Sequence, residues 1–187
     1  MNEETRTLIA LARHEAGHTI VNAALGCPVR YTYIRYIDGS LLGMTGSVPR
    51  LDMRKSEKVA ILYAGLLADR DYRHLRLNAP PLRMLAVQRQ ASSRLRRAIA
   101  RHRFDQIDAD AILPGGDLGQ IQRLLAGCRD PDRISRRGEI LARRALDSNE
   151  IPLRKIAQHL LVLGDLRGET LRDLLRQIVH IDTHSRI

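Results

Sequence analysis

The sequence predicts an α+β fold that is mostly α-helical and forms a single domain of 187 residues. Hydrophobic residues make up 44% of the chain and aromatic residues only 3%. The core must therefore consist of Leu, Ile, Val and Ala, a composition that favours helices. Over most of the chain these residues recur every three or four positions, as on one face of a helix. Only residues 29–48 have the alternation typical of strands, which predicts a small sheet.

The predicted sheet is a hairpin. Residues 29–37, VRYTYIRYI, alternate and are rich in β-branched and aromatic side chains. Residues 41–48, LLGMTGSV, form a second strand that its glycines weaken. Between them, Asp38 and Gly39 are a turn signal, so the two strands are expected to pair.

Helical spacing occurs in seven segments, which are residues 7–25, 56–74, 82–103, 117–127, 133–148, 152–163 and 168–180. Gly26 and Gly127 follow two of these segments and can end a helix, and Asn-Ala-Pro-Pro at 78–81 stops another. The last three segments are expected to form a C-terminal helical bundle. No internal repeat or flexible linker divides the chain, which again indicates one domain.

The formal net charge is +10, from 28 Arg and 3 Lys against 21 acidic residues. Such a balance is compatible with an acidic partner, such as nucleic acid or anionic lipid. We favour the simpler explanation, a GC-rich coding sequence whose arginines cover solvated helix faces, because few aromatic side chains are present for bases to stack on. Nucleic acid is therefore the less favoured partner.

Several features predict a soluble, cytoplasmic protein. The two cysteines, Cys27 and Cys128, form no CxxC pair and fit a reducing compartment. No apolar run approaches the roughly 20 residues that a membrane helix needs. The first residues are acidic and lack the apolar core of a signal peptide. We therefore expect no membrane span.

The segment ARHEAGHTIV, residues 12–21, carries the chemistry of the chain. On a helix, His14 and His18 lie one turn apart on the same face and can direct two imidazoles at one zinc ion. Glu15 is turned about 100° away and can reach a water on that metal. In such a site zinc lowers the pKa of the water and Glu15 takes its proton as general base. The alternative is a pair of ordinary solvent-facing histidines on a helix.

A catalytic zinc usually has three protein ligands and one open position, so a third ligand is needed. The metzincin extension would place Gly at 21 and His at 24, where this chain has Val21 and Ala24, so that class is excluded. The third ligand must lie further along the chain. Gly17, inside the motif, costs about 1 kcal/mol of helix stability relative to Ala and suggests close packing there.

The chain resembles the peptidase domain of the FtsH family of AAA proteases, a family of ATP-dependent zinc peptidases. The resemblance runs over about residues 8–178 and keeps the order of five segments, which are ARHEAGHTIV, VRYTYIRYIDGSLLGMTGSVP, EKVAILYAGLLADRDY, GGDLGQIQRLL and LRKIAQHLLVLGDLRGETLRDLL. It implies an FtsH-peptidase-like fold in which the first of these segments is the zinc-binding helix.

The resemblance also implies the residues of the site. It assigns His14, His18 and Asp117 as zinc ligands and Glu15 as the base. Asp117 follows two glycines at the start of a predicted helix, where the backbone can approach another element. A plain helix N-cap is the alternative role for Asp117. Three other aspartates upstream are lower-ranked candidates for the third ligand: Asp105, Asp108 and Asp110.

Three features depart from the family. The chain has no GxxxxGK[ST] motif for an ATPase module, we expect it to have no membrane anchor, and it carries an Arg-rich helical insertion at about 73–110. We expect a stand-alone zinc metallopeptidase, ATP-independent by itself, that hydrolyses peptides or unfolded protein segments. A separate ATPase or adaptor would deliver folded substrates, and the oligomeric state stays open. The substrate is expected to bind as a strand along Gly43, Met44, Thr45 and Gly46.

An alternative from another class is a catalytically idle scaffold with the same fold. It would bind an acidic partner, either nucleic acid or protein, through the Arg-rich helices. The intact HExxH motif together with Asp117 favours the enzyme, because an idle site has no chemical reason to keep all four residues. Bound zinc distinguishes the two hypotheses.

Overall fold

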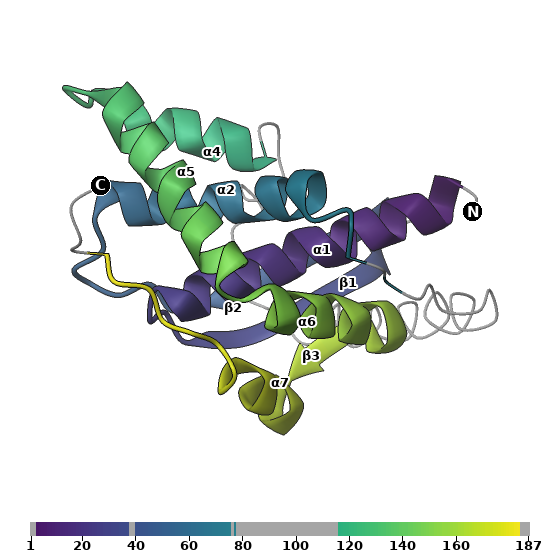
Figure 1. Ribbon diagram of the computed structural model, residues 1–187. Coiled ribbons are helices and arrows are strands. Elements are labelled where there is room, and N and C mark those ends of the chain that lie inside the picture. The colour runs from purple at the N-terminus through teal and green to yellow at the C-terminus, as the bar shows by residue number, and fades with distance from the viewer. Residues whose placement is uncertain (1–2, 38–39, 76, 78–115, 184–187) are drawn as a thin grey trace, which may run out of the picture.

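The structure is a computed structural model that describes residues 3–37, 40–75, 77 and 116–183. It has an α+β fold that is mostly helical, as the sequence predicted (Figure 1). Its described elements, in chain order, are α1 (Glu3–Ala24), β1 (Val29–Ile37), β2 (Ser40–Ser47), α2 (Lys55–Asp71), α4 (Gly116–Leu125), α5 (Pro131–Asp147), α6 (Glu150–Leu163), β3 (Asp165–Arg167) and α7 (Gly168–Leu175). The predicted helix at 82–103, most of the Arg-rich insertion, and Asp105, Asp108 and Asp110 lie outside the described residues.

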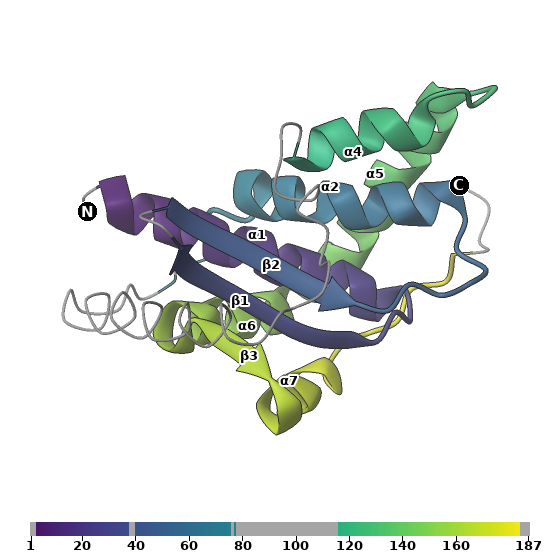
Figure 2. The same cartoon turned by 180° about the vertical axis from the view of Figure 1, so that it is seen from behind.

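The described strands form one antiparallel sheet in the order β2-β1-β3 (Figure 2). The predicted hairpin of β1 and β2 is confirmed, with Thr32 paired to Thr45 and Tyr33 to Met44. The third strand, β3, pairs with β1 on the other side through Tyr31, Thr32 and Tyr33. Among the described strands β2 is therefore an edge, and its partner β1 is central.

Helix α1 lies in the middle of the fold and contacts α2, α5, α6 and the β1–β2 hairpin. Most of its apolar positions are buried, because leucine, isoleucine and small alanine side chains recur on the faces that meet these neighbours. Four of these side chains have almost no exposed surface, namely Leu8, Ala12, Ala16 and Ile20. The central position means that polar residues on α1 are held between other elements.

Gly17 allows α1 and α2 to pack very closely. A Cβ at this position would stand 2.5 Å from the Ala64 carbonyl oxygen and 2.6 Å from the Ala68 Cβ. Only a residue without a side chain fits such a crossing. The close packing that the sequence suggested at Gly17 is confirmed, and it brings the middle of α2 against the HExxH segment of α1.

The C-terminal helices pack on the N-terminal half more than on one another. Helix α5 lies mainly against α2, and α6 lies mainly against α1. Gly164, with φ of 71°, ends α6 and turns the chain into β3. Of the helices predicted to form a C-terminal bundle, α5 and α6 therefore pack mainly on α2 and α1 and not on each other. Within the described residues, no helix is both long and apolar enough to cross a membrane.

Candidate metal centre

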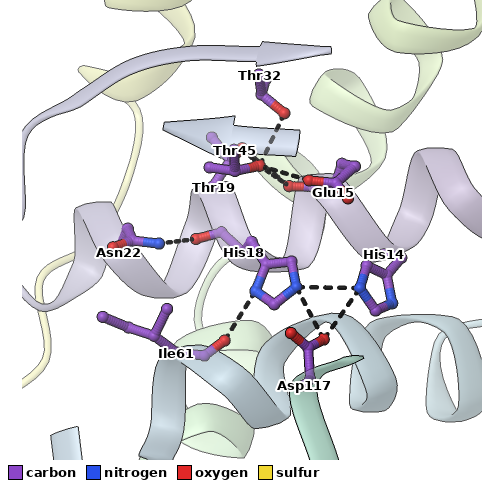
Figure 3. Close-up of polar contacts among 9 residues, drawn as sticks. All are labelled: His14, Glu15, His18, Thr19, Asn22, Thr32, Thr45, Ile61 and Asp117. Carbon is purple, nitrogen blue, oxygen red and sulfur yellow. Dashed lines mark hydrogen bonds and ion pairs between the residues drawn. The ribbon is translucent and has the colours of Figure 1, made fainter. Parts of the chain in front are cut away.

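The two motif histidines project from one face of α1 (Figure 3). His14 and His18 are one helical turn apart, and their Nε2 atoms lie 3.0 Å from each other. Their rings meet nearly edge to face, with centroids 4.7 Å apart. Both side chains are largely buried, so the alternative of two ordinary solvent-facing histidines does not describe them.

The orientation of His18 is set by α2. The Nδ1 atom of His18 lies 2.8 Å from the carbonyl oxygen of Ile61, and because a carbonyl can only accept, Nδ1 carries the proton. In the neutral ring the lone pair of His18 is then on Nε2, the atom that faces His14 and Asp117, and only the imidazolium form donates from Nε2 to Asp117. Metal-binding histidines commonly have such a second hydrogen bond, which fixes both tautomer and ring orientation.

Asp117 comes to the same point from the first turn of α4. Its Oδ2 atom lies 3.1 Å from Nε2 of His14 and 3.1 Å from Nε2 of His18. Asp117 lies inside the helix, after Gly116, so it is not the N-cap that was considered as its alternative role. The structure thus brings together all three predicted ligands, although 99 positions separate His18 from Asp117.

The negative charge of Asp117 and the positive charge of protonated His18 stabilise each other. Burial would raise the pKa of Asp117, but hydrogen bonds from His14 and His18 outweigh it and hold the pKa of Asp117 well below its usual range. Burial would likewise lower the pKa of His18, yet the bond to Asp117 and its negative charge raise it. An ionised carboxylate oxygen and the Nε2 atoms of two imidazoles therefore face one common point.

Gly65 of α2 provides the space for the two rings. A Cβ at Gly65 would stand 2.5 Å from Nε2 of His14 and 2.6 Å from Nε2 of His18. Any other residue would push a methyl group between the ligand atoms. The sequence analysis did not identify Gly65 or the Ile61 carbonyl as parts of the site. A glycine inside a predicted helix is a signal by which Gly65 could have been found.

The donor set fits a metal ion. The ligand atoms of His14, His18 and Asp117 all lie within 4.8 Å of one another, and they form the only such cluster of three or more His, Cys, Asp or Glu in the described ranges. Two imidazole nitrogens and one carboxylate oxygen are ligands that zinc accepts, and three protein ligands leave a position open. The group can therefore hold a metal ion.

Glu15 lies beside this cluster, on the side of α1 that faces β2 (Figure 3). Its side chain is only 4% exposed, and burial raises the pKa of its carboxyl, against the opposing effect of the nearby histidines. The Thr45 hydroxyl donates to Oε2 of Glu15 at 2.8 Å. The carboxylate of Glu15 is therefore hydrogen-bonded to Thr45 and also lines the pocket that His14, His18 and Asp117 line.

A pocket of about 640 Å³ opens over the centre. The three ligand residues and Glu15 line one part of it, and apolar side chains of α2 and α4 line another, namely Ile61, Leu62, Leu66 and Leu118. Of the four residues predicted to bind substrate, Gly43, Met44 and Thr45 line the pocket. Gly46 instead lies beneath the ring of Tyr31 and is not part of the lining.

No family model and no curated protein matches this chain. The interpretation of the centre therefore depends on the donor atoms, their distances and the pocket around them.

Proposed function

We propose that the protein is a zinc-dependent metallopeptidase of the FtsH type that acts on peptides or unfolded protein segments. One observation carries the proposal: the ligand atoms of His14, His18 and Asp117 converge within 4.8 Å, in the same pocket as the buried carboxylate of Glu15. Two histidines with an adjacent glutamate and a distant acidic ligand are the donor set of hydrolytic zinc sites.

Each residue has a distinct role in this proposal. The bound zinc supplies a Lewis acid that lowers the pKa of a water molecule and polarises a carbonyl group. The imidazoles of His14 and His18 and the carboxylate of Asp117 hold that ion. The Glu15 carboxylate accepts a proton from water and later donates it to the leaving amine. Burial of Glu15 keeps bulk water from competing for that proton.

The substrate is proposed to lie along β2 as an added strand. In the described sheet, β2 is paired on one side only, by β1, and Gly43, Met44 and Thr45 of this strand line the pocket. An exposed strand edge recognises an extended chain through backbone hydrogen bonds, with little dependence on sequence. Such a site suits unfolded segments, and folded substrates would require a separate ATPase or adaptor.

The direct test is hydrolysis by purified, zinc-loaded protein of unstructured fluorogenic peptides that differ in sequence. Glu15→Gln keeps the size of the side chain but cannot take a proton. We expect the wild type to cleave and Glu15→Gln to be slower by on the order of 100-fold or more with its zinc retained. Equal rates for the two proteins, or an inactive wild type carrying stoichiometric zinc, would contradict the proposal.

A further inference from the structure

A chain of buried hydroxyl groups connects the centre of the sheet to Glu15 (Figure 3). Thr32 of β1 is fully buried, and its Oγ1 lies 2.9 Å from Oγ1 of Thr45, its partner across the strand pair. Thr45 in turn lies 2.8 Å from Oε2 of Glu15. The chain thus ends on one particular oxygen of the carboxylate.

The available hydrogens fix the direction of this chain. Each threonine hydroxyl has one hydrogen to donate. Thr19 donates its hydrogen to the backbone oxygen of Glu15 at 2.9 Å, so that oxygen is satisfied without Thr45. The hydrogen of Thr45 is then free for the Glu15 carboxylate, which accepts at a shorter distance than the backbone oxygen does. It follows that Thr32 donates to Thr45 and Thr45 donates to Glu15.

Gly43, two residues before Thr45 on the same face of β2, closes the other side of the carboxyl group. The atom nearest to a Cβ built on Gly43 would be Oε1 of Glu15, and Cγ of Glu15 would stand 2.6 Å away. The Glu15 side chain is therefore packed directly on the strand, with Oε2 bonded to Thr45. Within the described part of the chain no donor contacts Oε1, and Glu15 lines the pocket. Oε2 of Glu15 is hydrogen-bonded to Thr45, and Oε1 is left to accept a proton.

We propose that Thr45 is a positioning residue for Glu15 and that Thr32 holds the Thr45 hydroxyl in its donating orientation. The proposal rests on the proposed peptidase function, in which Glu15 is the base. It adds that the strand proposed to carry the substrate also sets the orientation of the base. A substrate strand paired to β2 is then in fixed register with the oxygen that takes the proton.

A purely structural role for Thr45 makes a different prediction. Threonine is a good strand former, and valine has nearly the same shape and an equal preference for strands. If Thr45 only fills space, valine should replace it without kinetic effect. If its hydroxyl orients Glu15, valine should slow the reaction and serine, which keeps the hydroxyl, should restore it.

The kinetic test compares Thr45→Val, Thr45→Ser and a matched control, Thr7→Val. The control makes the same substitution on α1, at a hydroxyl that bonds the backbone oxygen of Glu3 and contacts neither Thr45 nor Glu15. We expect Thr45→Val to lower kcat on the order of 10- to 100-fold, as displaced catalytic groups do, with KM and zinc content unchanged. Thr45→Ser should recover most of the rate and Thr7→Val should match the wild type. Wild-type kcat in Thr45→Val, or no recovery in Thr45→Ser, would overturn the proposal.

A second measurement separates this proposal from the peptidase function itself. Glutamate labelled with ¹³C at the side-chain carboxyl gives a resonance for Glu15, assigned with Glu15→Gln. That resonance should change in Thr45→Val and stay in place in Thr7→Val, in both zinc-free and zinc-loaded protein. An unchanged resonance in Thr45→Val overturns the positioning role. If the wild type is inactive but the resonance moves, the peptidase function fails while the bond from Thr45 to Glu15 is established.

Discussion

Gly65 of α2 lies directly against the imidazole of His14, so closely that a Cβ on Gly65 would stand 2.5 Å from the Nε2 atom. The same Cβ would reach Nε2 of His18 at 2.6 Å. Since both nitrogens are predicted metal ligands, the absence of a side chain at Gly65 is what lets them converge. A helix–helix contact thereby becomes part of the metal centre.

Gly65→Ala is expected to weaken zinc binding on the order of 10- to 100-fold, the loss typical when a residue that supports metal ligands is changed. The added methyl group would displace one ring or both from the common point. Competition with a chromophoric chelator measures the affinity. The matched control is Gly119→Ala on α4, where a Cβ would meet nothing within 4 Å. Equal zinc affinity in Gly65→Ala and the wild type would contradict the role of Gly65.

Gly17→Ala tests the α1–α2 crossing. Alanine favours a helix over glycine by about 1 kcal/mol, but its Cβ would stand 2.5 Å from the Ala64 carbonyl oxygen, a backbone atom that cannot move aside alone. Overpacking of this kind costs about 1–3 kcal/mol, so we expect a net loss of free energy of unfolding. Urea denaturation measures it, and Gly119→Ala should show no loss. A Gly17→Ala protein as stable as the control would show that the helices can separate freely.

Asp117 should couple metal binding to the position of α4. Ile121 is the only buried residue of this helix, so the body of the protein holds α4 weakly through apolar contacts. We expect zinc to slow amide hydrogen exchange in α4 of the wild type, because the ion joins Asp117 to α1. In Asp117→Ala zinc should have little effect on that exchange. Equal protection of α4 by zinc in the two proteins would remove Asp117 from the ligand set.

Glu57 gives a prediction for the dependence of stability on pH. Burial would raise the pKa of Glu57, but hydrogen bonds from the backbone N–H and guanidinium of Arg54 outweigh it and lower the pKa. Because the folded pKa lies below the unfolded value of about 4.3, the stabilisation is present above that pH and is lost as the pH falls through the folded pKa. The bond to the Arg54 N–H also caps α2.

Glu57→Gln keeps an oxygen that accepts from the Arg54 N–H but removes the charge, so it should reduce the free energy of unfolding by about 1 kcal/mol at pH 7, the difference between a hydrogen bond to a charged group and one to a neutral group. Urea denaturation of both proteins at pH 7 and pH 3 measures the difference. The difference should shrink at pH 3, which lies below the unfolded pKa, because folding must then release the proton that the unfolded carboxyl holds. An equal difference at the two pH values would show that the charge of Glu57 contributes nothing.

Local patterns predicted the fold class, the hairpin and the two histidines, because helical and strand periodicities depend only on residues a few positions apart in the sequence. Asp117 needed the resemblance to a family, since no local rule joins positions 99 apart. The three-residue β3 is too short to show alternation and was missed. Thr45 was predicted as a substrate contact, while its hydrogen bond to Glu15 depends on how β2 lies over α1, which only tertiary packing determines.

The most direct test of the metal centre is anomalous diffraction at the zinc edge from a crystal of the zinc-loaded protein. We predict one peak per chain, bonded to Nε2 of His14, Nε2 of His18 and the carboxylate of Asp117 at about 2.0–2.2 Å. A peak at other residues, or no peak at the convergence of these three side chains, would contradict the account.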